Sequence, residues 1–219
     1  MSKVIIFGNG QLSQIAHYYL SYDSDYKVAA FTVDSEFIKN DNFENKPLVD
    51  FKKLKSLFSP DKFKLFLPIS YSGINSLRYK KYIEAKEMGY SFITYINSKT
   101  SIYNSSIGEN TFILENNTIQ PFSTIGNNVI LWSGNHIGHH SVISDHCFVS
   151  SQVVISGSVY IGENTFLGVN STLRDNIKIG KSCIIGAGAN VTSSLEDETI
   201  IKPQKNIISN LKSNQFRKL

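Results

Sequence analysis

Four of the five histidines lie within one short segment, at His136, His139, His140 and His146. An imidazole has an ordinary pKa of about 6.5, so it can take a proton from an attacking amine or hydroxyl at neutral pH. Imidazole is also a common zinc ligand. The segment therefore indicates either a general base or a metal site. The fifth histidine, His17, stands alone on a predicted helix and is expected to be structural.

A second group of residues could bind a nucleotide. Gly8-Asn9-Gly10 follows one apolar run, Asp34 follows another, and a third loop carries Tyr71 and leads to Asn75. Backbone N–H groups at a helix N-terminus bind phosphate, and glycine lets the anion approach closely. An acid after the next strand can meet a ribose or base. The third glycine of the full motif is missing, so a tight turn without a ligand is the alternative.

The elements that carry the histidines follow from an internal repeat. Starting at Ile107 and stepping by six, fifteen consecutive positions are aliphatic: Ile107, Ile113, Ile119, Ile125, Leu131, Ile137, Ile143, Val149, Ile155, Ile161, Leu167, Leu173, Ile179, Ile185 and Val191. A period of six is neither helical nor a simple strand alternation. It fits three short strands per coil, with the aliphatic pointing inward and the coils about 4.8 Å apart. The repeat predicts five coils of a left-handed parallel β-helix over residues 99–199, with glycine helping at the corners.

The same arithmetic places His139. It follows a core aliphatic by two residues, so we expect it on a flat, outward-facing position. Gly157 lies one coil further along and has no side chain. That leaves room for a thioester against the imidazole, with the Gly157 amide free to donate to its carbonyl oxygen.

The first 98 residues alternate apolar runs with helical patterns. Strands are expected at 3–7, 26–33, 64–69 and 91–96, with helices from 11 to about 20 and over 75–88. This alternation is typical of a small doubly wound α/β domain with a Rossmann-like parallel sheet. The predicted domains are therefore 1–98 and 99–199, and the tail 200–219 is expected to cap the last coil.

The order of these parts resembles the sialic-acid, bacillosamine and perosamine group of nucleotide-sugar N-acetyltransferases. The resemblance covers nearly the whole chain and is carried by Gly8-Asn9-Gly10, Asp34, Gly138-His139-His140 and the segments 161–171 and 185–189. It implies transfer of an acetyl group from acetyl-CoA to the amine of a nucleotide-linked amino-sugar of the 4-amino-4,6-dideoxy type. It also implies a place in bacterial surface-glycan biosynthesis, for O-antigen or capsule.

The resemblance further implies a role for each site residue. His139 acts as the general base, the Gly157 amide binds the thioester carbonyl, and Ala187 helps to hold the pantetheine arm. The nucleotide-sugar is implied to lie against Gly8, Asn9, Gly10, Asp34, Tyr71 and Asn75. A homotrimer with active sites between subunits is implied, and no metal is expected.

The chain departs from this group at three places. His140 stands where the group often has an acid that orients the imidazole, so Asn135 or Asp145 is expected to take that role. Gly10-Gln11-Leu12-Ser13 replaces the usual Gly-Gly-His-Ala turn, which leaves the nucleotide open among UDP, dTDP, GDP and CDP. The segment 201–205 replaces a Gly-x-Pro-Ala sequence, so its lysines are candidates for holding the far end of CoA.

Composition narrows the function classes. The 219 residues are 41% hydrophobic and 18% charged, which favours a folded protein. The net charge of +4 is spread thinly and does not suggest nucleic-acid binding. No run reaches the roughly 18 apolar residues of a membrane span, and the N-terminal apolar run is too short for a signal peptide. With only Cys147 and Cys183, both at small core positions, a cytoplasmic protein is expected.

Two further expectations concern assembly and alternative functions. A flat face carrying Trp132, Phe148 and Tyr160 would expose more apolar surface than a monomer usually leaves bare, which predicts a trimer. The alternatives are a sugar O-acyltransferase or a longer-chain acyltransferase of the same fold. Zinc-dependent hydration, as in the γ-class carbonic anhydrases, and a non-catalytic scaffold are alternatives of other classes.

Overall fold

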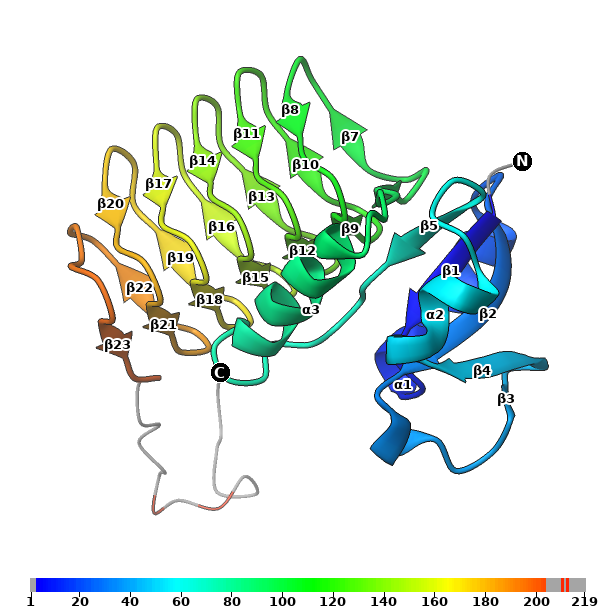
Figure 1. The fold of residues 1–219 in the computed structure, drawn as a ribbon. Coiled ribbons are helices and arrows are strands. Elements are labelled where there is room, and N and C mark those ends of the chain that lie inside the picture. The colour runs from blue at the N-terminus through cyan, green and yellow to red at the C-terminus, as the bar shows by residue number, and fades with distance from the viewer. Residues whose placement is uncertain (1–2, 204–209, 211, 213–219) are drawn as a thin grey trace.

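The computed structural model describes residues 3–203, 210 and 212, and Figure 1 shows the two parts that they form. An open parallel sheet with its helices makes up the N-terminal part, and a stack of short strands makes up the rest. None of the helices among these residues is long and apolar enough to cross a bilayer.

The N-terminal sheet confirms the predicted Rossmann-like domain. Its strand order is β3-β4-β2-β1-β5. The strands are β1 (Lys3–Phe7), β2 (Lys27–Val33), β3 (Asn42–Phe43), β4 (Lys46–Asp50) and β5 (Phe63–Phe66). The helical elements are α1 (Gln11–Tyr22), η1 (Ser35–Phe37), η2 (Phe51–Lys53), α2 (Leu54–Leu57) and α3 (Ser76–Glu87). Every pairing is parallel except that of β3 with β4. Four of the five residues of β1 are buried, as expected for a central strand covered on both faces.

The predicted strand over 91–96 is not one strand of this sheet. Phe92 forms only an isolated bridge with Leu65, whereas β6 (Tyr95–Ile96) pairs with β9 (Phe112–Ile113). The chain therefore enters the β-helix before residue 98. Strands β3 and β4 were not predicted, because β3 has only two residues and β4 has a proline and charged residues at both ends.

The strands from β6 onward form three parallel sheets, which we name face 1, face 2 and face 3. Face 1 holds β6, β9, β12 (Ile130–Leu131), β15 (Phe148–Val149), β18 (Phe166–Leu167), β21 (Ile184–Ile185) and β23 (Ile200–Ile201). Face 2 holds β7 (Ser101–Ile102), β10 (Thr118–Ile119), β13 (His136–Ile137), β16 (Val154–Ile155), β19 (Thr172–Leu173) and β22 (Asn190–Val191). Face 3 holds β8 (Ser106–Ile107), β11 (Thr124–Ile125), β14 (Val142–Ile143), β17 (Tyr160–Ile161) and β20 (Lys178–Ile179). This is the predicted left-handed β-helix.

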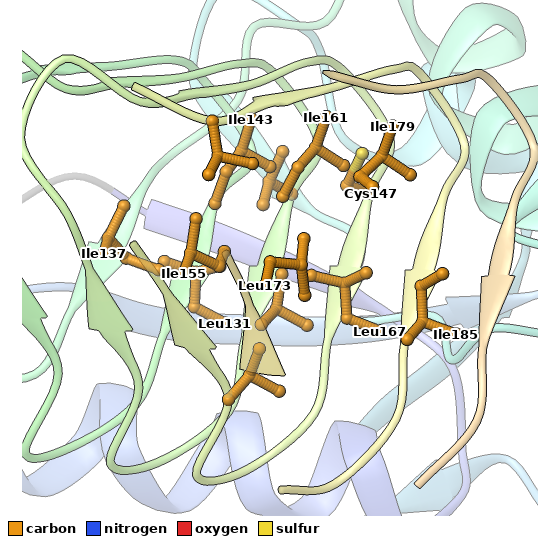
Figure 2. Packing of buried hydrophobic residues seen from close by; sticks show 14 of the residues in the cluster. Leu131, Ile137, Ile143, Cys147, Ile155, Ile161, Leu167, Leu173, Ile179 and Ile185 are labelled. Carbon is orange, nitrogen blue, oxygen red and sulfur yellow. The ribbon is translucent and has the colours of Figure 1, made fainter. Parts of the chain in front are cut away.

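The predicted aliphatic positions form its core. Figure 2 shows the side chains of successive coils stacked in rows, such as Ile143, Ile161 and Ile179. From Ile113 to Val191 all of these positions are buried, and Cys147 and Cys183 pack among them as free thiols. Burial raises the pKa of the Cys147 thiol to about 12, so this cysteine is a core residue rather than a nucleophile.

The β-helix extends beyond the fifteen predicted repeats at both ends. Ile96 and Ile102 pack against its core, as do Leu195 and Ile201. The step from Ile102 to Ile107 is five residues and the step from Val191 to Leu195 is four, which breaks the six-residue register. Residues 200–201 therefore belong to the β-helix, and the rest of the predicted cap lies largely outside the described residues.

The corners are turned mainly by residues other than glycine. The left-handed position at each corner is most often asparagine, as at Asn110, Asn128 and Asn164. Glycine has a different function at Gly138, where a Cβ atom would lie 2.5 Å from the Ser156 carbonyl carbon of the next coil. It allows close approach between coils and does not supply the turn.

The N-terminal domain covers face 1. Ala16 and Leu20 of α1 share a buried cluster with Phe112, Ile130 and Phe148 of face 1. The predicted flat face of Trp132, Phe148 and Tyr160 is therefore wrong. Trp132 and Phe148 lie along face 1 beside this domain, whereas Tyr160 lies on face 3 under the ammonium of Lys178.

Candidate active site

A cavity of about 650 Å³ lies at the carboxyl ends of β1, β2 and β5. Gly8, Asn9, Gly10 and Asp34, four of the residues predicted to contact a nucleotide, all line it. Parallel strands direct their carboxyl ends to one sheet edge, which explains why these separate segments meet. Residues not anticipated in this wall include Ser70, Lys80 and Lys81.

The turn after β1 is fixed by its first glycine. Gly8 has a φ of 117°, and a Cβ atom there would collide with the Ser13 hydroxyl. That hydroxyl is buried and donates to the Phe7 carbonyl at 3.2 Å. Gly10 caps α1, and a Cβ at Gly10 would meet nothing within 4 Å, so the N-terminus of α1 opens toward the cavity.

Asp34 is already paired inside this cavity. Its Oδ1 lies 2.7 Å from Lys81 Nζ, which also contacts Glu84 Oε2 at 2.8 Å. Burial alone would lower the pKa of Lys81, but the hydrogen bonds that it donates to the two carboxylates, together with their negative charges, outweigh burial and raise that pKa. Lys81 is thus a charged ammonium in the cavity wall. The side chain of Asn9 is also engaged, donating to the Phe37 carbonyl at 2.9 Å.

A second cavity of about 470 Å³ adjoins the first and lies against face 1. Gln11, Leu12 and Ser70 line both cavities. Aromatic rings dominate the second wall, which includes Tyr71, Trp132, Phe148 and Phe166, and Ala187 lies at its edge. The Tyr71 ring packs on Phe148 and Phe166 with centroid distances of 5.1 and 4.7 Å, so the predicted Tyr71 closes this second cavity rather than the first.

His139 lies on the corner between faces 2 and 3, which we name corner 2–3. It occupies a turn and not the flat position that was predicted. The predicted neighbour is present, because a Cβ atom at Gly157 would lie 2.7 Å from His139 Nε2 and Cε1. A side chain at position 157 would force the His139 ring to move from this place. Among the described residues, the Gly157 amide N–H has no protein acceptor.

The two residues expected to orient His139 are bonded elsewhere. Asn135 is buried, with Oδ1 accepting from the Val153 N–H and Nδ2 donating to the Trp132 carbonyl. Asp145 accepts two hydrogen bonds from Asn127, at 2.7 and 3.2 Å. The contact to the His139 ring comes from His140, with the two Nδ1 atoms 3.1 Å apart.

The clustered histidines diverge in space. His136 lies on face 2, His139 and His140 lie on corner 2–3, and His146 lies on the corner between faces 3 and 1, which we name corner 3–1. His146 is buried, its Nδ1 lies 2.9 Å from Asn128 Nδ2, and its ring packs on Tyr79 and Tyr82 of α3. Among residues 3–203, 210 and 212, no three His, Cys, Asp or Glu side chains gather as a metal site.

Asn75 does not line either cavity. It is buried in a left-handed conformation before α3, and its Nδ2 donates to the Asn164 carbonyl at 2.8 Å. The left-handed turn at residues 73–75 directs this side chain to corner 3–1. Asn75 therefore docks α3 on the β-helix, and the structure places it apart from the other residues predicted to contact a nucleotide.

Arg78 is the anchor that the sequence did not reveal. Its guanidinium is fully buried and donates to the carbonyl groups of Ile69, Ser70, Asn128, His146 and Cys147. Burial lowers its pKa to about 9, which leaves it charged at neutral pH. Arg78 fixes the loop that carries Ser70 and Tyr71 against corner 3–1. It lies in a polar helical stretch, where no pattern distinguishes it from exposed basic residues.

Comparison with known proteins identifies the repeats. The family model of bacterial transferase hexapeptide repeats matches residues 104–139, 122–157 and 158–193. No curated protein sequence matches the chain significantly.

Solved structures match both domains together. A histidine-to-asparagine variant of perosamine N-acetyltransferase from Caulobacter crescentus, in complex with CoA and GDP-perosamine, superimposes with a TM-score of 0.84 at 25% identity. The match covers 93% of this chain and 94% of that one. The acetyltransferase domain of PglB from Neisseria gonorrhoeae, in complex with acetyl coenzyme A, gives a TM-score of 0.79 at 18% identity, covering 92% and 96%. WeeI from Acinetobacter baumannii gives 0.77 at 17% identity, covering 93% and 97%, and these two matches bear on the fold. Residues 104–193 thus match the hexapeptide-repeat model, and both domains together are similar in fold to the perosamine N-acetyltransferase.

Proposed function

We propose that this protein transfers an acetyl group from acetyl-CoA to the amino group of a nucleotide-linked amino-deoxy-sugar. The observation that carries the proposal is the joint occurrence of a cavity at the carboxyl ends of β1, β2 and β5 and a histidine facing a side-chain-free glycine on the β-helix. The perosamine N-acetyltransferase, which shares both domains, binds CoA and GDP-perosamine. We infer that the substrate is a 4-amino-4,6-dideoxy sugar. We also infer that the reaction takes place in the cytoplasm and serves surface-glycan synthesis.

The proposed reaction forms an amide and releases a thiol. The sugar amine attacks the thioester carbonyl carbon, and His139 Nε2 takes the proton that the amine loses. The negative charge on the carbonyl oxygen needs a donor, and the Gly157 N–H lacks a protein acceptor among the described residues. The C–S bond then breaks, and the departing sulfur takes the proton from the imidazolium.

The N-terminal cavity is proposed to hold the nucleotide-sugar. The α1 N-terminus, opened by Gly10, suits the diphosphate, because its N–H groups carry partial positive charge. Asp34 and Asn9 remain in our proposal as contacts of the nucleoside, and Tyr71 as a contact of the sugar in the adjoining cavity. Ala187, whose N–H also has no protein acceptor among the described residues, is proposed to hold the pantetheine arm.

We infer a homotrimer in which neighbouring subunits share each active site. His139 and Gly157 lie on corner 2–3, whereas Ala187 follows face 1, at the corner between faces 1 and 2, and lines the aromatic cavity. His139 lines neither cavity of its own chain. A second copy that presents its His139 to the cavity of the first would complete the constellation.

A substrate panel tests the proposal. Purified protein is incubated with acetyl-CoA and UDP-, dTDP-, GDP- and CDP-linked amino sugars, and thiol release is measured with and without a metal chelator. Thiol release that requires a free sugar amine and persists with the chelator is the expected result. Acetylation of hydroxyl groups, preference for a longer acyl-CoA, or chelator-sensitive hydration of carbon dioxide would support the alternatives instead.

A further inference from the structure

We propose that His140 is a positioning residue that supplies a neutral hydrogen-bond acceptor to His139 and so fixes the tautomer of the catalytic imidazole. The inference rests on the proposed function, in which His139 Nε2 is the base. It assigns to a second histidine the orienting role that the sequence suggested for Asn135 or Asp145.

The geometry of the two rings limits where one proton can lie. Their Nδ1 atoms are 3.1 Å apart, with the rings nearly perpendicular at 85°. A hydrogen bond at this distance holds one hydrogen between the two nitrogens. Either His139 donates to His140, or His140 donates to His139.

Only the first arrangement leaves His139 active as a base. If His139 Nδ1 carries the hydrogen, its Nε2 has a free lone pair, and this is the ring edge that faces Gly157. His140 is then the neutral tautomer with its hydrogen on Nε2. If His140 donates from Nδ1, a neutral His139 carries its hydrogen on Nε2 and cannot take another proton there.

The surroundings of His140 hold its ring in place without adding charge. Its backbone has a φ of 59°, and its N–H donates to the Pro121 carbonyl at 3.2 Å. The ring packs on Phe122 of the preceding coil at 4.9 Å, while the His139 N–H donates to Gln120 Oε1 at 3.0 Å. Within the part of the chain that the structure describes, no ion pair reaches either ring.

The acid that follows on the same corner is bonded elsewhere. Asp175 lies one coil beyond Gly157, and its carboxylate contacts Asn176 at 2.6 Å and Arg174 at 3.9 Å. On this corner the two imidazoles are therefore each other's hydrogen-bond partners. Protonation of His139 removes the free lone pair on its Nε2. Protonation of His140 at Nδ1 turns that residue from an acceptor into a donor toward His139.

Two matched variants separate the acceptor from the ring. His140→Asn keeps an acceptor oxygen at the δ position and suits the left-handed backbone, in which asparagine is common. His140→Phe keeps a ring against Phe122 but has no acceptor, and Phe122 itself occupies the same corner position at a φ of 65°. We expect His140→Asn to stay within about threefold of the wild-type kcat and His140→Phe to lose about tenfold to a hundredfold, with KM values unchanged.

Two readouts report on positioning itself. Nitrogen-15 NMR of the His139 ring should show hydrogen on Nδ1 in the wild type and in His140→Asn, and a shift of population to Nε2 in His140→Phe. His140→Asp should move the acidic limb of the kcat profile to higher pH than His140→Asn, because a carboxylate favours the imidazolium. Equal kcat and the same tautomer in His140→Phe and the wild type would overturn the proposal.

His139→Ala distinguishes this failure from failure of the proposed function. If His139→Ala abolishes transfer while His140→Phe is fully active, only the role of His140 is wrong. If His139→Ala keeps wild-type activity, the base assignment falls and the role of His140 falls with it.

Discussion

At the scale of single residues, the wall of the cavity at the carboxyl ends of β1, β2 and β5 contains a network of ion pairs. Lys81 brings a buried positive charge into its wall, and Asp34 and Glu84 hold that charge in place. The acid after β2 therefore positions an ammonium, and in our proposal it also presents a carboxylate oxygen to the nucleotide. Neither Lys81 nor Glu84 was predictable, since a helical stretch rich in lysine is usually a solvated surface.

Asp34→Asn tests the contact with the nucleotide. A hydrogen bond to a charged group contributes about 1.5 to 3 kcal/mol, so we expect KM for the nucleotide-sugar to rise roughly tenfold to a hundredfold. The KM for acetyl-CoA should stay nearly unchanged. The matched control is Asp50→Asn at the end of β4, where the carboxylate caps the Lys52 N–H and lines neither cavity. Equal effects on both substrates would remove Asp34 from the pocket.

The site residues that could be predicted from the sequence are those whose place follows from the spacing of the repeats or from the end of a strand. Because coils repeat every 18 residues, Gly157 had to lie beside His139, and the structure brings them together. Gly8 and Asp34 also followed from strand ends. Asn75, His140 and Arg78 could not be placed in this way, because their contacts depend on side-chain rotamers and on how two domains pack.

At the scale of elements, helix α3 fastens the N-terminal domain to corner 3–1 (Figure 1). Arg78 donates to five carbonyl groups there, and lysine cannot reproduce its planar, forked geometry. We expect Arg78→Lys to lower the free energy of unfolding by about 2 to 4 kcal/mol, because buried carbonyls lose their donors. Denaturant unfolding measures the change, with Arg174→Lys on an exposed strand end as the control. An Arg78→Lys protein as stable as Arg174→Lys would show that this guanidinium is not the anchor.

The buried His146 on the same corner should make the stability of the protein depend on pH. Burial lowers the pKa of His146, so the folded protein binds fewer protons at this residue than the unfolded chain, whose histidine titrates near 6.5. Stability from His146 is therefore fully present above about pH 6.5 and is lost as the pH falls below it. Melting temperatures between pH 7.5 and 5.5 should fall less steeply for His146→Asn, which continues the asparagine row of Asn110 and Asn128. Identical slopes in the two proteins would contradict this account.

The elements themselves were largely predictable. One six-residue register held from Ile107 to Val191, and the structure buries every position from Ile113 onward and packs Ile107 against the same core. The coils at both ends escaped prediction because a five-residue and a four-residue step interrupt the register. The strand expected at 91–96 divided between two sheets, since an apolar run says nothing about which neighbours its backbone will pair with.

At the scale of the whole molecule, the proposed chemistry needs more than one chain. The cavities proposed for the nucleotide-sugar do not include His139, which lies on corner 2–3, so a monomer would keep the proposed base apart from the proposed substrate. Light scattering should therefore give about three chains per particle. A monomer at micromolar concentration would count against shared active sites.

Mixed trimers test the sharing of sites directly. Ser70→Trp would fill both cavities from an exposed position, and His139→Ala removes the base, so each variant alone should be inactive. Co-expressed chains should recover activity, because some sites then combine the intact cavity of a His139→Ala chain with the intact His139 of a neighbouring Ser70→Trp chain. Mixed trimers no more active than the two variants alone would place the whole site within one chain.

Acetyl transfer to a sugar amine, with His139 as the base, is the activity that the whole molecule is proposed to support. The most direct test measures kcat for wild type and His139→Asn with acetyl-CoA and the preferred nucleotide-linked amino sugar, and identifies the product by mass spectrometry. We expect an amide product in the wild type and a kcat lowered by about 10² to 10⁴ in the variant, with its trimer intact. A His139→Asn protein with wild-type kcat at neutral pH, or an ester in place of the amide, would contradict this proposal.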